Sequence, residues 1–256
     1  MASAARNLKK ALAACSSTRQ PRHVQHVVVL GTGTGVGKTA VSCALVASLT
    51  RTNPSARVAG LKPIESGITA DRSGSDAARL EAASLGFEPP SKHPLYALPE
   101  PLSPHLAARR AGLPPIEPRA VSAWLSEWEH YVTRSAVSPH DWCVIETAGA
   151  VLSPLNVGCT NLDLARALEP AIWVLVAADA LGTLHDTRAT VEALAARGRP
   201  ADYLVLSAAR VDHSTGTNAD EMRLLGIANP SAVLARDETS LDEFARLLAS
   251  MQPRRP

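Results

Sequence analysis

The sequence of 256 residues has no long apolar stretch and no excess of either charge. Its longest apolar runs, Val27–Leu30 and Ile172–Ala178, have the length of strands and fall far short of the roughly 20 residues that cross a membrane. The 26 lysines and arginines outnumber the aspartates and glutamates by only 2. Such a balance argues against nucleic acid and against a membrane surface as partners.

Cysteines are few and far apart. The four of them, Cys15, Cys43, Cys143 and Cys159, form no pair with metal-ligand spacing, so no cysteine metal site is predicted. Cys43 and Cys143 lie in apolar runs and are expected to be buried as small hydrophobic residues. This pattern fits a reducing compartment, and we expect a cytoplasmic protein.

Acidic residues are missing from the first part of the chain, where the first one is Glu65. Residues 1–22 are basic, rich in alanine and contain serine, which is also typical of organelle-targeting peptides. Import into a mitochondrion or plastid is therefore the alternative location. We expect residues 1–24 to be a basic, disordered tail and residues 25–256 to form one domain.

Short apolar runs alternate with helix-like patterns along this domain. Apolar runs without polar alternation indicate strands that are covered on both faces, and helical crossovers between them indicate a parallel sheet. We predict a single α/β domain with a mostly parallel central sheet flanked by helices. The predicted strands are His26–Leu30, Val58–Leu61, Trp142–Glu146, Ile172–Ala177, Tyr203–Ser207 and Ala232–Ala235.

Helical patterns follow several of these strands. The predicted helices are Lys38–Thr50, Ser75–Leu85, Val121–Thr133, Thr187–Arg197 and Leu241–Met251. Ser240 and Glu243 at the last helix have the spacing of a capping box. Prolines crowd the segment from Pro89 to Pro118, which predicts a loop with a short helix over one edge of the sheet.

The stretch LGTGTGVGKTA connects the first predicted strand to the first predicted helix. Glycines at such a junction let backbone N–H groups approach a phosphate, because Gly33, Gly35 and Gly37 can adopt positive φ. This predicts a domain of the P-loop NTPase type. We expect Lys38 to face the β- and γ-phosphates from an exposed loop, and Thr39 to ligate Mg²⁺. The predicted nucleotide-binding residues of the loop are Gly33, Thr34, Gly35, Val36, Gly37, Lys38 and Thr39.

This loop differs from the common pattern G-x-x-x-x-G-K-[ST], because Thr32 stands where that pattern requires glycine. A dinucleotide-binding pattern is excluded by Val36, which also stands in place of a glycine. A glycine turn with an incidental lysine is the structural alternative, and the strand–loop–helix context weighs against it. GTGTGVGKT resembles the G-T-x-T-x-V-G-K-T loop of dethiobiotin synthetases, in which the longer spacing is normal.

Three further segments resemble motifs of the same family. LKPIESG resembles K-P-x-x-[ST]-G, which implies that Lys62 and Ser66 bind substrate. GSDAARL implies that Asp76 ligates Mg²⁺, although an aspartate at a helix start is also a common structural feature. WCVIETAGA resembles E-[GT]-A-G-G, which implies that Glu146 binds Mg²⁺ and nucleotide, and Ala150 replaces the last glycine.

Two more segments extend the resemblance. PLSPHLAARRAGLPP resembles the family segment P-x-[SA]-P-H-x-A-A near the substrate. ADALGTLHDT resembles a segment that meets the substrate carboxylate across a dimer interface, which implies a homodimer whose site includes Leu181–Asp186 of a second subunit. LSAARVD lacks the Asn-Asp pair that many relatives carry where the adenine base binds. This predicts modest discrimination between ATP and other nucleoside triphosphates.

The resemblance implies a dethiobiotin synthetase. Such an enzyme closes a cyclic urea on 7,8-diaminopelargonate with CO₂ and ATP, through a carbamate and a carbamic-phosphoric anhydride. It assigns catalysis to Thr34, Lys38, Lys62 and Ser66, and Mg²⁺ binding to Thr39, Asp76 and Glu146. The alternatives are a regulatory P-loop module without a substrate site and an amidoligase of cobyrinate type, which would need a glutamine-hydrolysing domain.

Overall fold

The computed structural model describes residues 24–68, 72–84, 87–134 and 141–251. The expected tail at 1–24 and Cys15 therefore lie outside the described residues, apart from Val24. Among the described cysteines, Cys143 is buried as expected, whereas Cys43 is only partly buried. Of the helices in these ranges, none has both the length and the apolar character that crossing a bilayer requires.

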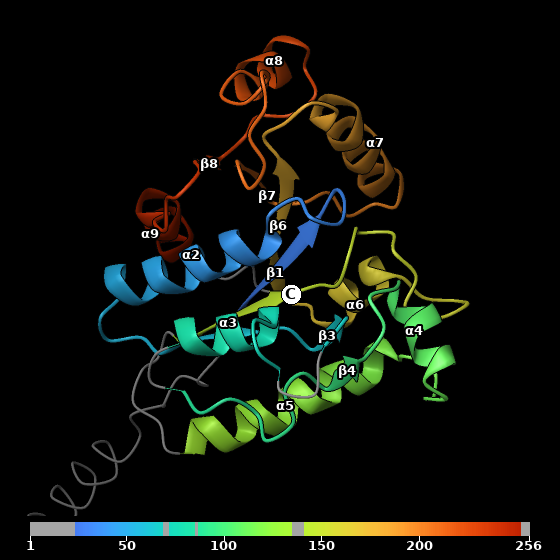
Figure 1. Ribbon diagram of the computed structural model, residues 1–256. Helices are drawn as coiled ribbons and strands as arrows, with labels where there is room; N and C mark the ends of the chain where they lie inside the picture. The colour runs from blue at the N-terminus through green and yellow to red at the C-terminus, as the bar shows by residue number, and fades with distance from the viewer. Residues whose placement is uncertain (1–23, 69–71, 85–86, 135–140, 252–256) are drawn as a thin grey trace, which may run out of the picture.

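Six parallel strands form the central sheet, in the order β2–β5–β1–β6–β7–β8 (Figure 1). They are β1 (Gln25–Gly31), β2 (Val58–Leu61), β5 (Trp142–Glu146), β6 (Ala171–Ala178), β7 (Tyr203–Ser207) and β8 (Ala232–Leu234). Every predicted strand is present, and its ends differ by at most one residue. The predicted α/β fold with a parallel central sheet is confirmed.

The two faces of this sheet carry separate hydrophobic cores. Successive side chains of a strand point to opposite faces, so Val27 and Val29 pack into one core and Val28 and Leu30 into the other. The helices α2 (Lys38–Thr52) and α9 (Asp242–Ser250) cover the first face, and α3 (Asp76–Ala83) packs beside α2 (Figure 1). The second face is covered by α4 (Pro104–Arg110), α5 (Pro118–Arg134), α6 (Asn161–Ala167), α7 (Thr183–Ala196) and α8 (Asn218–Leu224).

The predicted helices are present, but α5 and α7 begin earlier than predicted, and α5 starts at Pro118 rather than at Val121. α7 begins at Thr183, one turn before the predicted start, because Gly182 at φ 97° serves as its N-cap. α9 begins at Asp242 with Leu241 as N-cap, and no described side chain caps it, so the capping box is not formed. Instead, Arg51 of α2 donates to Ser240 Oγ at 3.0 Å and pairs with Asp242.

A second, two-stranded parallel sheet was not predicted. It consists of β3 (Ile64–Ser66) and β4 (Tyr96–Leu98). β4 and α4 both lie in the proline-rich segment, so the predicted short helix is confirmed and the strand was missed. The short helices α6 and α8 were also missed.

The strand order places the motif segments together. β2, β5 and β1 are parallel neighbours, so the residues that follow them lie at the same edge of the sheet. Lys62 follows β2, Glu146 ends β5, and the glycine-rich loop follows β1. Ligand sites of open α/β sheets lie at this carboxyl edge.

Candidate active site

The glycine-rich loop connects β1 to the first residue of α2, Lys38. Gly35 has φ 72° and Gly37 has φ 94°, as expected for a backbone that turns its N–H groups toward an anion. A Cβ at Gly37 would also lie 2.2 Å from Ser207 Oγ, so only glycine fits there. Gly33 does not have a positive φ, and its carbonyl oxygen takes part in the contact described next.

Lys38 is buried within this loop, with 6% of its surface exposed, so the expected position on an exposed loop was wrong. As the first residue of α2, its side chain folds back over the loop, and Nζ donates to Gly33 O at 3.0 Å. Burial lowers the pKa of Lys38 to about 8; Glu146 opposes this shift, and Lys62 adds to it. The loop thus holds a cation at the start of a helix, which suits a polyphosphate.

Lys62 lies between the two carboxylates that were predicted to bind metal. Its Nζ donates to Asp76 Oδ2 at 2.5 Å and to Glu146 Oε1 at 2.7 Å. Thr39 Oγ1 donates to the same Glu146 oxygen at 2.9 Å. The structure therefore brings Thr39, Asp76 and Glu146 together, with the ammonium group of Lys62 among them.

The protonation of this cluster follows from its charges. Burial alone would lower the pKa of Lys62, but Glu146 and then Asp76 outweigh burial and raise it. Burial alone would raise the pKa of Asp76, but Lys62 and hydrogen bonding to Thr39 lower it. Lys62 is therefore held as an ammonium group and Asp76 as a carboxylate.

The oxygen atoms of the cluster fit a hard divalent cation. Glu146 is fully buried, and its Oε2 has no hydrogen-bond partner among the described residues. Two carboxylates and a hydroxyl are ligands that Mg²⁺ accepts together with phosphate oxygens and water. The described residues hold no group of three or more His, Cys, Asp and Glu side chains that could bind a metal alone, so a nucleotide would have to complete the coordination.

Two predicted catalytic hydroxyls lie beside this cluster. Ser66 ends β3, and its Oγ is buried without a hydrogen-bond partner among the described residues. Thr34 is exposed at the tip of the phosphate loop and faces the loop after β5, because a Cβ at Gly149 would lie 3.8 Å from its Oγ1. Thr34 is thus open to a ligand, and Ser66 has an unused hydrogen-bonding hydroxyl.

The loop after β5 tolerates the substitution of glycine by alanine. Ala150 does not have a positive φ, so its methyl group causes no backbone strain. Asn161 at the start of α6 holds the loop by donating from Nδ2 to the carbonyls of Ala148 and Ala150, at 2.5 and 2.9 Å. Asn161 was not predicted, and no local sequence signal points to it.

Two residues that support the cluster were also missed. The Lys62 backbone N–H donates to His93 Nε2 at 2.8 Å, and His93 Nδ1 contacts Glu81 Oε1 at 2.7 Å. Burial lowers the pKa of His93 against the effect of Glu81, which leaves a neutral ring that accepts from Lys62. Glu65 accepts two backbone N–H groups at the start of α3.

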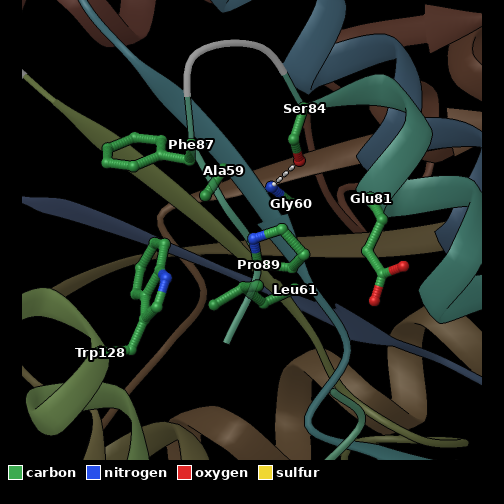
Figure 2. A pocket seen from close by; sticks show the side chains of 8 residues that line it. All are labelled: Ala59, Gly60, Leu61, Glu81, Ser84, Phe87, Pro89 and Trp128. Carbon is green, nitrogen blue, oxygen red and sulfur yellow. Dashed lines mark hydrogen bonds between the residues drawn. The ribbon is translucent and has the colours of Figure 1, made fainter. Parts of the chain in front are cut away.

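The described residues also line an open groove and a small cavity. The groove, of about 190 Å³, lies beside the phosphate loop and is lined by Thr32, Ala150, Val151, Leu152, Ala189, Thr190 and Ala193. The cavity shown in Figure 2, of about 10 Å³, lies against β2 beside the rings of Phe87 and Trp128, which are tilted by 53° to each other. At this cavity, Ser84 Oγ accepts from Gly60 N at 2.8 Å. It has room for about one water molecule and is no ligand site.

The segment predicted to act across a dimer interface lies at the start of α7. Leu181 is 84% exposed, and Gly182 begins the helix without a side-chain cap from the described residues. The Leu181 N–H already donates to Asp212 Oδ2 at 2.8 Å. An anion at this helix start would therefore meet the amides that follow Gly182.

The fold and the site define a P-loop nucleotide-binding protein. They combine a parallel sheet, a glycine-rich loop, a buried lysine at a helix start and a carboxylate at the end of a neighbouring strand. A family model described as "AAA domain" matches residues 25–244. A chain of the MinC:MinD cell division protein complex from Aquifex aeolicus shares the fold, with a TM-score of 0.50 at 12% identity over 91% of this chain and 99% of that chain.

Sequence relatives define the family more narrowly. The ATP-dependent dethiobiotin synthetase BioD of Anaeromyxobacter dehalogenans (strain 2CP-C) is 39% identical over 225 residues, which cover 87% of this chain and 95% of the relative. The protein of that name from Saccharopolyspora erythraea is 34% identical over 86% of this chain and 93% of the relative. The chain belongs to the dethiobiotin synthetase family, and the resemblance seen in its motifs is confirmed.

Proposed function

We propose that this chain is an ATP-dependent cyclo-ligase that makes dethiobiotin. The observation that carries the proposal is the meeting of Lys62, Asp76 and Glu146 with the phosphate loop at one edge of the sheet. A loop that only bound nucleotide would not need a second buried lysine, and the relatives match over nearly their whole length. The regulatory alternative is therefore not favoured.

The proposed substrates are 7,8-diaminopelargonate, CO₂ and ATP. One amine takes up CO₂ and loses a proton to form a carbamate, whose oxygen attacks the γ-phosphorus of ATP and releases ADP. The second amine then attacks the carbonyl carbon of the mixed anhydride, loses a proton, closes the ring and releases phosphate. Each step gathers negative charge between ATP and the carbamate, so catalysis depends on positioned cations and hydrogen-bond donors.

The residues of this chain divide that work. The backbone of residues 33–37 and the start of α2 bind the phosphates, and Lys38 neutralises them. Lys62 is the group that would meet the carbamate and the transferred phosphoryl group, and the hydroxyls of Ser66 and Thr34 would donate hydrogen bonds beside it. Other nucleoside triphosphates could also serve, because Ala208 and Ala209 follow β7 where many relatives carry a polar pair.

Mg²⁺ is part of the proposal, with Thr39, Asp76 and Glu146 as its protein ligands. When bound, it would neutralise the phosphate oxygens. Because the Lys62 ammonium group lies between the two carboxylates, this lysine would have to leave them for the ion to bind. Lys62 would then be released toward the substrate.

We further propose a cytoplasmic homodimer with neither a nucleic-acid nor a membrane partner. The phosphate loop and Lys62 can hold only the diamine end of the substrate, so its carboxylate needs another site. The start of α7 in a second subunit would provide one, with exposed Leu181 at the interface. Mixing a Lys38→Ala subunit with a Gly182→Trp subunit should restore activity, since one of the two hybrid sites carries neither defect. A proven heterodimer without activity would contradict the shared site.

The overall proposal is tested by measuring phosphate release with the diamine, bicarbonate, ATP and Mg²⁺, and again with each omitted. We expect release to require the diamine and to match the dethiobiotin formed. ATP hydrolysis that is unchanged without the diamine, and yields no dethiobiotin, would support the regulatory module instead.

A further inference from the structure

Glu65 lies in β3 between the substrate-side residues Lys62 and Ser66, with 7% of its surface exposed. Neither carboxylate oxygen points to solvent or to a basic side chain among the described contacts. Oε1 accepts from the backbone N–H of Asp76 at 2.6 Å, and Oε2 accepts from that of Ala77 at 2.9 Å. Both oxygens are thus used on the first turn of α3.

This contact connects two separate parts of the site. β3 carries Ser66 and begins two residues after Lys62, whereas α3 begins with Asp76, whose side chain reaches Lys62 Nζ. α3 also packs against α2 and β2. The buried Glu65 carboxylate adds a direct link from β3 to the first turn of α3, because it accepts two of its N–H groups.

We propose that Glu65 is a positioning residue that sets the carboxylate of Asp76 for the divalent cation that accompanies the nucleotide. It acts by holding the start of α3 against β3, and it touches neither the reacting atoms nor the cation. The inference rests on the proposed role of Asp76 as a metal ligand. Groups that orient a ligating side chain in this way typically change metal affinity about 10- to 100-fold when removed.

Helix capping alone is the competing explanation, and the chain offers a matched control. Ser75 also caps α3, because its Oγ accepts from Ala78 N at 3.1 Å. It is the neighbour of Asp76 in the chain and forms no contact of this kind with β3. Ser75→Ala should therefore weaken the helix start without releasing it from the strand.

The experiment measures Mn²⁺ binding by the full chain with a non-hydrolysable ATP analogue, using the electron paramagnetic resonance signal of free Mn²⁺. We expect Glu65→Gln and Glu65→Ala to weaken Mn²⁺ binding about 10-fold or more. Ser75→Ala should leave it within about twofold, even if it lowers the melting temperature as much as the Glu65 variants. In turnover assays, saturating Mg²⁺ should recover most of kcat in Glu65→Gln.

Asp76→Asn separates the failure of this inference from that of the metal assignment. If Asp76→Asn leaves Mn²⁺ binding unchanged, Asp76 is no metal ligand, and both the metal assignment and the positioning role of Glu65 are refuted. If Asp76→Asn weakens binding but Glu65→Gln does not, only the positioning role falls. In an Asp76→Asn background, Glu65→Gln should cause no further loss, and an additive loss would show that Glu65 acts elsewhere.

Discussion

Replacing Lys62 with methionine should produce an inactive protein that binds divalent cations more tightly. The unbranched side chain of methionine nearly matches lysine in length and removes only the charge. In the resting protein that charge lies 2.7 Å from Glu146 Oε1 and 2.5 Å from Asp76 Oδ2. At the proposed metal site of the wild type, a cation must displace the Lys62 ammonium group from both carboxylates. In Lys62→Met no ammonium group competes with the cation.

The magnitude follows from the burial of Glu146, which is fully inaccessible. Breaking a buried ion pair on one side costs about 3–5 kcal/mol, and about 2–4 °C of melting temperature is lost per kcal/mol in a domain of this size. Without divalent cations, Lys62→Met should therefore melt roughly 6–20 °C below the wild type. Two unit charges at 2.7 Å attract by about 6 kcal/mol at an effective dielectric constant of about 20. If the bound cation recovers even a quarter of this attraction in Lys62→Met, Mn²⁺ binds about tenfold more tightly than in the wild type.

The assay compares melting curves with chelator and with Mg²⁺ plus ATP analogue, and follows Mn²⁺ binding by the same resonance method. Added cation should restore stability in Lys62→Met more than in the wild type. Lys62→Arg keeps the positive charge and should stay close to the wild type in both measurements. Mn²⁺ binding by Lys62→Met that equals or falls below that of the wild type would refute the competition between ammonium and cation.

Three further predictions concern other parts of the molecule. Lys38→Ala should abolish turnover while the melting temperature stays near that of the wild type, since burial already disfavours its charge; full activity would remove the nucleotide site from this loop. The ratio of kcat/KM for ATP to that for other nucleoside triphosphates should stay well below the ~10⁴ of dedicated hydrogen-bonding sites, and strict use of ATP would contradict this. Burial lowers the pKa of His26, but its hydrogen bond to Glu129 and the charge of that residue raise it above 6.5 overall. Protonated His26 therefore stabilises the folded protein at low pH, and this stabilisation is lost as pH rises through the raised pKa. His26→Gln should then lower the free energy of unfolding more at about pH 5.5 than at about pH 8.5, and an equal loss in urea unfolding at both would exclude this linkage.

The sequence predicted the parts of this fold that depend on local patterns. Six strands were found because strands buried on both faces must be continuous apolar runs. The residues of the cluster were predicted from the family resemblance of the segments that carry Lys62, Asp76 and Glu146, because a lysine after a strand or an aspartate at a helix start is by itself a common structural feature. β3 was missed because two of its three residues, Glu65 and Ser66, are polar and leave no apolar run, and β4 because its three residues lie among prolines.

The supporting contacts were beyond prediction because they join residues that are distant in the sequence. His93 meets the Lys62 backbone 31 residues away, and Glu65 meets that of Asp76 11 residues away. The predicted capping box was wrong for the same reason, because Ser240 accepts a hydrogen bond from Arg51, which lies 189 residues away in the sequence. Local patterns identified the side chains of the site, and the packing determined which of them contact each other.

The buried lysine between two carboxylates also determines how the protein behaves when divalent cations are scarce. Many small metalloproteins lose their fold with the ion, because nothing else balances the ligand charges. Here the chain carries its own counter-ion, because Lys62 pairs with both Asp76 and Glu146. If the proposed Mg²⁺ site is correct, magnesium starvation of a cell would stop the chemistry and leave the protein folded. Activity would return at once when the ion returned, without refolding or new synthesis.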